Sequence, residues 1–119
     1  MIGFGRGIAE TRLELMDPGA NGAVAYEYAA AGERRWFFFA TREGAWSSLN
    51  WASDAAVLCF AADALFFAGG SYVEYAGKRA VECRVQLPRL ECRKDGKQWS
   101  VIGPDRVLLN PAFLPGSLR

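Results

Sequence analysis

The chain has 119 residues, of which 51% are hydrophobic and 23% are charged, and its formal net charge is +1. This composition is typical of a folded globular protein and excludes an intrinsically disordered chain. A net charge this close to zero gives no long-range attraction toward nucleic acid or a membrane surface. Because the length is that of one domain, we expect residues 1–119 to form a single domain with its own core.

The absence of histidine limits the chemistry that the chain can perform. Histidine is the usual acid–base group near neutral pH and the partner of nucleophilic serine and cysteine, so those mechanisms are excluded. The three cysteines, Cys59, Cys83 and Cys92, have no CxxC spacing and no histidine to complete a zinc site. We expect them to pack as small apolar groups in the core. No metal, no cofactor and no disulfide framework is expected, and a reduced cytoplasmic protein is the simplest interpretation.

Alternating side chains predict strands in the first third of the chain. Residues 8–16 and 23–30 alternate, and the second segment places Val24, Tyr26 and Tyr28 on one face. Residues 34–41 form a third expected strand, which carries large apolar side chains in succession: Trp36, Phe37, Phe38 and Phe39. A strand that is apolar on both faces must be covered on both, so we expect a helix on one side of it.

Residues 54–68 are predicted to form that helix. Ser53 or Asp54 can accept the unpaired N–H groups at its start, and the glycines at 69–70 can end it. Only Asp63 is polar between those ends, and a helix that is apolar all round is normally buried between other elements or at an oligomer interface. Its 15 residues are too few to cross a bilayer, which takes about 20.

The remaining sequence returns to a period of two and predicts four more strands. They are expected over residues 72–75, 79–87, 90–94 and 97–102, with residues 107–109 as a last short strand or a helical turn. In the second of these, the side chains expected to face inward are Val81, Cys83, Val85 and Leu87. Asp95-Gly96 indicates a tight hairpin. The order is therefore βββ-α-ββββ, an α+β fold in which a curled antiparallel sheet of about six to seven strands packs around one apolar helix.

Two segments could indicate a nucleotide-binding or nucleic-acid-binding site, but the pattern of neither supports this function. The glycines of residues 3–7 (GFGRG) lead into a strand, whereas phosphate-binding loops follow a strand and open a helix. Residues 78–97 carry seven basic and three acidic side chains, but the two signs interleave as they do on a solvated sheet face. We therefore expect no nucleic-acid partner.

Asp63 is the candidate polar group of a site, because Cys59 and Phe67 lie four residues before and after it on the expected helix. A buried carboxylate needs a partner or a shifted pKa. At the floor of a pocket it would bind a ligand. A salt bridge to an arginine or a solvent-facing position is the simpler interpretation.

The aromatic side chains are more numerous than a core of this size needs. Trp46 and Trp51 fall in the connection 41–53, where they would either cap the open end of the sheet or form an exposed binding surface.

Two functions follow from these residues. The first is a non-enzymatic binding protein that self-associates into a homo-oligomer, with another protein as a further partner. The excess of Arg, Ala and Gly, whose codons are GC-rich, indicates a bacterial source rather than a function. Because small bacterial proteins of this kind are often accessory or mobile-element proteins, we expect that class here. The alternative is a protein that binds a small apolar or cationic molecule, or a carboxylate-based enzyme, with its pocket between sheet and helix. The candidate lining residues are Asp63, Glu74, Trp36, Phe38, Trp46, Trp51, Tyr26 and Tyr72.

Overall fold

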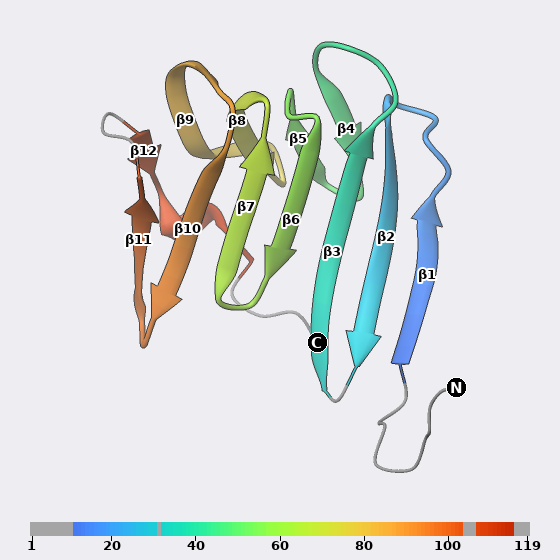
Figure 1. Ribbon diagram of the computed structural model, residues 1–119, viewed down its shortest axis with the longest axis horizontal. Coiled ribbons are helices and arrows are strands. Elements are labelled where there is room, and N and C mark those ends of the chain that lie inside the picture. Colours follow the sequence, from blue (N-terminus) through green and yellow to red (C-terminus); the bar gives the residue numbers. More distant parts are fainter. Residues whose placement is uncertain (1–10, 31, 104–106, 116–119) are drawn as a thin grey trace.

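Two antiparallel sheets stacked face to face form the protein, in a computed structural model that describes residues 11–30, 32–103 and 107–115 (Figure 1). The larger sheet has seven strands in the order β1-β2-β3-β6-β7-β10-β11, and the smaller has five in the order β12-β9-β8-β5-β4. The chain passes between the sheets several times, because β4 and β5 separate β3 from β6, and β8 and β9 separate β7 from β10.

The strand bounds are as follows. The larger sheet consists of β1 (Thr11–Asp17), β2 (Ala23–Ala30), β3 (Glu33–Ala40), β6 (Val57–Ala61), β7 (Ala64–Ala68), β10 (Leu90–Asp95) and β11 (Gln98–Ile102). The smaller sheet consists of β4 (Trp46–Ser48), β5 (Trp51–Ser53), β8 (Gly70–Tyr75), β9 (Lys78–Leu87) and β12 (Val107–Leu109). One short 3-10 helix, η1 (Pro111–Phe113), follows β12.

The core lies between the two sheets and is built on aromatic side chains. Phe38 of β3 stacks on Trp46 of β4, with ring centroids 5.4 Å apart, and lies 6.0 Å from the ring of Trp51 of β5. Trp51 in turn lies 4.9 Å from the ring of Phe60 of β6. Each fully buried side chain of this size stabilises the fold by roughly 1.5–3 kcal/mol. Strands β3 and β6 of one sheet are thereby joined to β4 and β5 of the other.

The predicted helix over residues 54–68 is wrong, and with it the α+β class and the order βββ-α-ββββ. These residues form the hairpin β6–β7, in which Val57 pairs with Ala68 and Ala61 with Ala64. No α-helix occurs among the described residues, and the second layer that covers β3 is the five-stranded sheet. The curled sheet of six to seven strands is replaced by two sheets that bury a common core.

The hairpin resembles a helix in sequence because it is apolar on both faces. Leu58, Phe60, Leu65 and Phe67 point into the core, while Val57, Cys59 and Phe66 lie on the opposite face. Alternation is invisible when both faces are apolar, and a buried strand then cannot be told from a buried helix by periodicity. Asp63, the one polar residue, lies in the turn between the two strands.

Several expected strands are confirmed. β2 spans residues 23–30 as predicted, β9 and β10 differ from the expected ranges by one residue, and residues 107–109 form a strand rather than a helical turn. Two strands were not expected, β4 and β5 in the connection 41–53. Leu49 and Asn50 join them with φ values of 51° and 71°, the left-handed conformations of a type I′ hairpin turn.

Two inward placements are wrong. Cys59 lies on the outer face of the larger sheet rather than in the core, since it is the neighbour of Leu58 and Phe60, which point inward. Val85 is 64% exposed and lies where the β8–β9 register shifts, between the pairing of Tyr72 with Glu82 and that of Gly70 with Leu87. The glycines at residues 3–7 lie outside the described residues. Within the described part of the chain, no helix is long and apolar enough to cross a membrane.

Candidate functional site

Four of the eight candidate site residues lie in the core between the sheets. Phe38, Trp46 and Trp51 are at most 3% exposed and contact one another, and Trp36 packs against the same cluster. Trp46 is fixed further by its indole N–H, which donates to the carbonyl of Ala55 at 2.7 Å. These side chains fill the space between the layers in which a ligand pocket was expected. The pocket expected between sheet and helix cannot form as predicted, because the described residues contain no α-helix.

Tyr72 and Glu74 are brought together on the outer face of the smaller sheet by Arg79. The guanidinium of Arg79 donates two hydrogen bonds to Glu74, at 3.0 and 2.8 Å, and lies 4.2 Å from the centre of the Tyr72 ring. Glu82 adds a second carboxylate at 3.8 Å. Burial and the neighbouring carboxylates raise the pKa of Tyr72, while the hydrogen bond that Arg79 donates to Glu74 raises the pKa of Arg79. The cluster is a self-contained cation–π and ion-pair unit.

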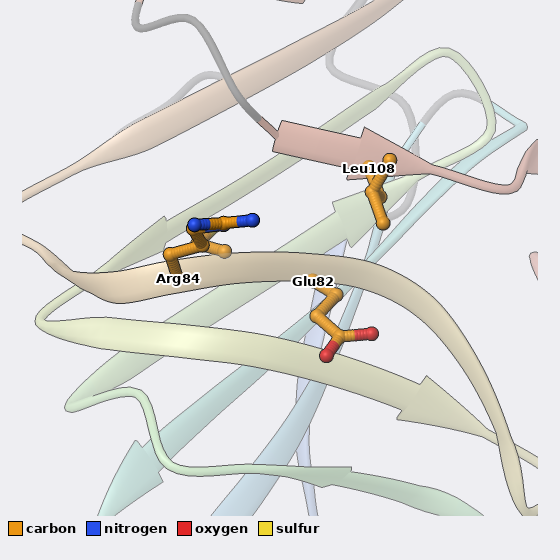
Figure 2. A pocket seen from close by; sticks show the side chains of 4 residues that line it. Glu82, Arg84 and Leu108 are labelled. Atoms are coloured by element: carbon orange, nitrogen blue, oxygen red, sulfur yellow. The ribbon is translucent and has the colours of Figure 1, made fainter.

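A depression of about 710 Å³ borders this cluster between β9 and β12 (Figure 2). Figure 2 shows Glu82 and Arg84 from β9 and Leu108 from β12, and Cys83 completes the lining. Glu82 already interacts with Arg79, so the one carboxylate that the described residues contribute to this lining is engaged elsewhere. Paired-carboxylate chemistry needs two such groups facing the same reacting atoms.

Asp63 is exposed in the β6–β7 turn, at one end of the larger sheet. Its carbonyl accepts a hydrogen bond from the backbone N–H of Lys94, at 2.8 Å, which ties the turn to β10. Asp63 lines a depression of about 310 Å³ together with Ala61, Ala62 and residues 32–35 of the β2–β3 turn and the start of β3. The arginines of this lining, Arg34 and Arg35, already have carboxylate partners, Glu27 at 3.5 Å and Glu33 at 3.8 Å. Asp63 is therefore an exposed member of a surface depression rather than a carboxylate buried among apolar side chains.

Asp54 is the most strongly engaged carboxylate, and sequence reasoning treated it only as a helix cap. It accepts hydrogen bonds from the backbone N–H and the hydroxyl of Ser71, at 2.7 and 2.6 Å, and from the N–H of Tyr72 at 3.3 Å. Partial burial raises the pKa of Asp54, but these hydrogen bonds outweigh that effect and hold the pKa below its ordinary value. Asp54 thus fixes the start of β8, and its role is structural.

The thiols are not activated. Burial raises the pKa of Cys59 and of Cys83, and burial together with the nearby Cys83 and Glu91 raises that of Cys92 to about 12. A thiol in this state is a poor nucleophile and a poor metal ligand. Among the described residues, no group of three or more acidic or cysteine side chains is placed to hold a metal ion.

An apolar row crosses the outer face of the larger sheet. The strand registers place one residue of each strand directly opposite the next, in the sequence Leu15, Tyr26, Phe37, Cys59, Phe66, Glu91, Ile102. A second, shorter row runs beside it through Val24, Phe39, Val57 and Ala68. We call these eleven residues the outer rows. No described strand or helix packs over them, because the smaller sheet lies on the opposite face.

The most exposed side chains on this face are at β1, where Leu13 and Leu15 are 64% and 52% exposed. Ile102 at the opposite edge and Phe39 in the second row are also exposed, at 49% and 42%, while the inner members of the first row are half-buried by their neighbours. Tyr26, a predicted ligand contact, lies on this face with its ring 6.0 Å from that of Phe39. A depression of about 530 Å³ lies beside the row, lined by Tyr28, Ala30, Glu33, Arg35 and Phe37. Exposed, contiguous apolar surface of this kind marks an interaction site.

Sequence reasoning found half of this surface. Alternation placed Val24, Tyr26 and Tyr28 on one face of β2, and the apolar residues of β3 were recognised as needing cover on both sides. The missing step was the register, which shows that these side chains line up with Leu15 on one side and Cys59 on the other. Comparisons with protein-family models, with curated proteins and with solved structures gave no match.

Proposed function

We propose that the protein is a non-enzymatic binding protein that acts as a homo-oligomer, and that its copies meet at the β1 end of the outer face of the seven-stranded sheet. The observation that carries the proposal is the first of the outer rows, apolar except for Glu91, which begins at β1 with Leu15, 52% exposed. Leu13 lies beside it on the same face of β1 and is 64% exposed. Transfer of such side chains from water into a contact between copies is favourable by about 25 cal/mol per Å² of apolar surface.

The polar groups support binding over catalysis. The best-positioned carboxylates are committed within the chain, Asp54 to the start of β8 and Glu74 to Arg79. The thiols carry raised pKa values and the chain has no histidine. Exposed leucines on an edge strand are unfavourable in water, and contact with another molecule would bury them.

The test is the mass in solution, measured by light scattering on a size-exclusion column over a range of concentrations. We expect the wild-type chain to exceed its monomer mass of 13.1 kDa. Leu13→Asp should return it to the monomer mass, because a carboxylate at this position makes burial unfavourable. Leu108→Asp is the matched control: Leu108 is 65% exposed on the outer face of the other sheet, so this variant should keep the wild-type mass. A wild-type chain that stays at 13.1 kDa at every concentration would contradict the proposal.

A further inference from the structure

Strand β1 is the long free edge of the described molecule. It has seven residues and pairs only with β2 (Figure 1). The two edge strands of the smaller sheet, β4 and β12, have three residues each, and the opposite edge of the larger sheet, β11, contacts β12. A long edge strand presents a row of unpaired N–H and C=O groups, which is a template for pairing with another strand.

Within the described residues, the regular part of this edge is centred on Leu13. The β1–β2 register is continuous from Thr11 to Leu15 and then shifts, because a bulge separates Leu15 from Asp17. A bulge bends the strand and ends regular pairing. An added strand can therefore pair with five described residues, and the middle one is Leu13.

The charges on either side of Leu13 lack a counterpart. Arg12 and Glu14 lie on the face of the strand opposite to Leu13, and neither forms an ion pair within the described residues. Glu14 stands directly opposite Glu27 of β2, whose own cation is Arg34 at 3.5 Å. Like charges directly opposite on neighbouring strands are destabilising. A cation on the free side of Glu14 would offset this repulsion.

We propose that β1 pairs antiparallel with β1 of a second copy, about a two-fold axis normal to the sheet that passes through Leu13. Because antiparallel pairing keeps the sum of paired residue numbers constant, this axis sets Arg12 of each copy directly opposite Glu14 of the other. It also brings the two Leu13 side chains together on the outer face. The two seven-stranded sheets then continue into one another, and their outer rows form one surface.

The neighbouring registers are disfavoured by the same charges. An axis through Arg12 would set that arginine against itself, and an axis through Glu14 would set two glutamates against each other beside Glu27. Of these three axes, only the one through Leu13 pairs opposite charges, and it does so twice. The inference rests on the proposed self-association and adds to it the strand, the axis and the paired residues.

Charge reversal tests the register. Arg12→Glu and Glu14→Arg should each weaken the dimer by about tenfold or more, because each sets like charges opposite each other at two symmetric places. The double variant, Arg12→Glu with Glu14→Arg, should recover the wild-type dissociation constant within about threefold, since it restores both pairs with their signs exchanged. Glu14→Arg also relieves the repulsion from Glu27, so its loss of dimer cannot be attributed to a less stable monomer. Arg84→Glu, on the other sheet, is the control and should leave the dimer unchanged.

Disulfide trapping tests the axis. Residues directly opposite each other on antiparallel strands have Cα atoms about 4.5–5.5 Å apart, within the range that a disulfide spans. Leu13→Cys should therefore form a covalent dimer on mild oxidation. Leu15→Cys is the matched control, because the axis separates the two copies of this residue by four residues along the strand, about 14 Å. The wild-type chain is the blank for this experiment, because its own Cys59 lies half-buried on the same face.

The outcomes separate this inference from the function on which it rests. Weaker dimers in both single reversals, recovery in the double variant and selective trapping at residue 13 support it. A dimer that is insensitive to the reversals, or that is trapped equally at residues 13 and 15, overturns the edge pairing and leaves self-association intact. A chain that is monomeric at all concentrations overturns both.

Discussion

Asp54 carries more of the local structure than any other carboxylate, because three hydrogen bonds from Ser71 and Tyr72 converge on it. We expect Asp54→Asn to lower the free energy of unfolding at neutral pH by about 1–2 kcal/mol, toward the lower end of the range for charged hydrogen bonds because the site is partly exposed. Urea denaturation measures this. Asp63→Asn is the control, since that side chain is exposed in a turn and should change nothing.

The same residue gives a pH dependence of known sign. The folded-state pKa of Asp54 is below its unfolded value of 3.8, so its contribution is present above that value and is lost as the pH falls through the folded pKa. The difference in unfolding free energy between wild type and Asp54→Asn should therefore shrink toward zero in acid. A difference that stays constant from neutral pH down to about pH 2 would show that the carboxylate charge is not what stabilises this site.

Two tryptophans of the core differ in how their indole N–H is paired. Trp46 donates to the carbonyl of Ala55 at 2.7 Å, whereas the buried indole nitrogen of Trp36 has no partner among the described residues. Both Trp→Phe changes leave a small cavity, but only Trp46→Phe also leaves a buried carbonyl unpaired. We expect Trp46→Phe to be more destabilising than Trp36→Phe by about 1 kcal/mol in thermal or urea unfolding. Equal losses would contradict this assignment.

At the scale of the element, the register of the hairpin β6–β7 predicts that alanine substitutions at two neighbouring residues differ in their effect on stability. The helix expected from sequence does not predict this difference. Phe66 and Phe67 point to opposite faces: Phe67 is fully buried between the sheets and Phe66 is half-buried on the outer face. Phe67→Ala should cost about 3–5 kcal/mol of unfolding free energy, and Phe66→Ala less than half as much. Urea denaturation of the two variants measures the difference. Similar losses would contradict the register of this hairpin.

The sequence predicted β2, β3, β9, β10 and β11 to within one residue at each end. β9 and β10 carry charged side chains at alternate positions, whereas β3, which is apolar on both faces, was recognised by its length and by the turn before it. β6 and β7 were missed because both faces are apolar, so the period of two is hidden and Ala62-Asp63 is too weak a turn signal to divide the segment. β4 and β5 were missed because three-residue strands are too short to show a period, although Asn50 is a typical residue of the turn between them.

The positions of the candidate site residues could likewise be predicted only in part. Trp46 and Trp51 were expected either to cap the open end of the sheet or to form an exposed binding surface, whereas both are buried in the core between the two sheets. Sequence alone does not say which face of a two-faced strand will be covered, because that depends on where the second layer lies. The outer rows could be recognised only once six strand registers were known.

At the scale of the whole molecule, the unequal size of the two sheets determines where the free surface lies. β4, the last strand of the smaller sheet, packs against β2. β1 contacts β4 at the end of β1, where the Ser48 hydroxyl donates a hydrogen bond to Asp17 at 2.6 Å. The rest of β1 projects past the second layer with Arg12 and Glu14 on one face and Leu13 and Leu15 on the other. The five-stranded sheet therefore does not cover most of β1, which is held in the larger sheet by its pairing with β2.

If two copies complete each other at this strand, the thermal stability should depend on concentration. A folded dimer that dissociates on unfolding is stabilised by mass action, so Tm should rise by about 3 °C for each tenfold increase in concentration of a chain of this length. Differential scanning calorimetry over a hundredfold range measures the slope. Leu13→Asp should remove the slope and lower Tm at high concentration, while Leu108→Asp, equally exposed on the other sheet, should keep it. A wild-type Tm that does not move with concentration would show that the β1 edge and its leucines do not stabilise the fold through self-association.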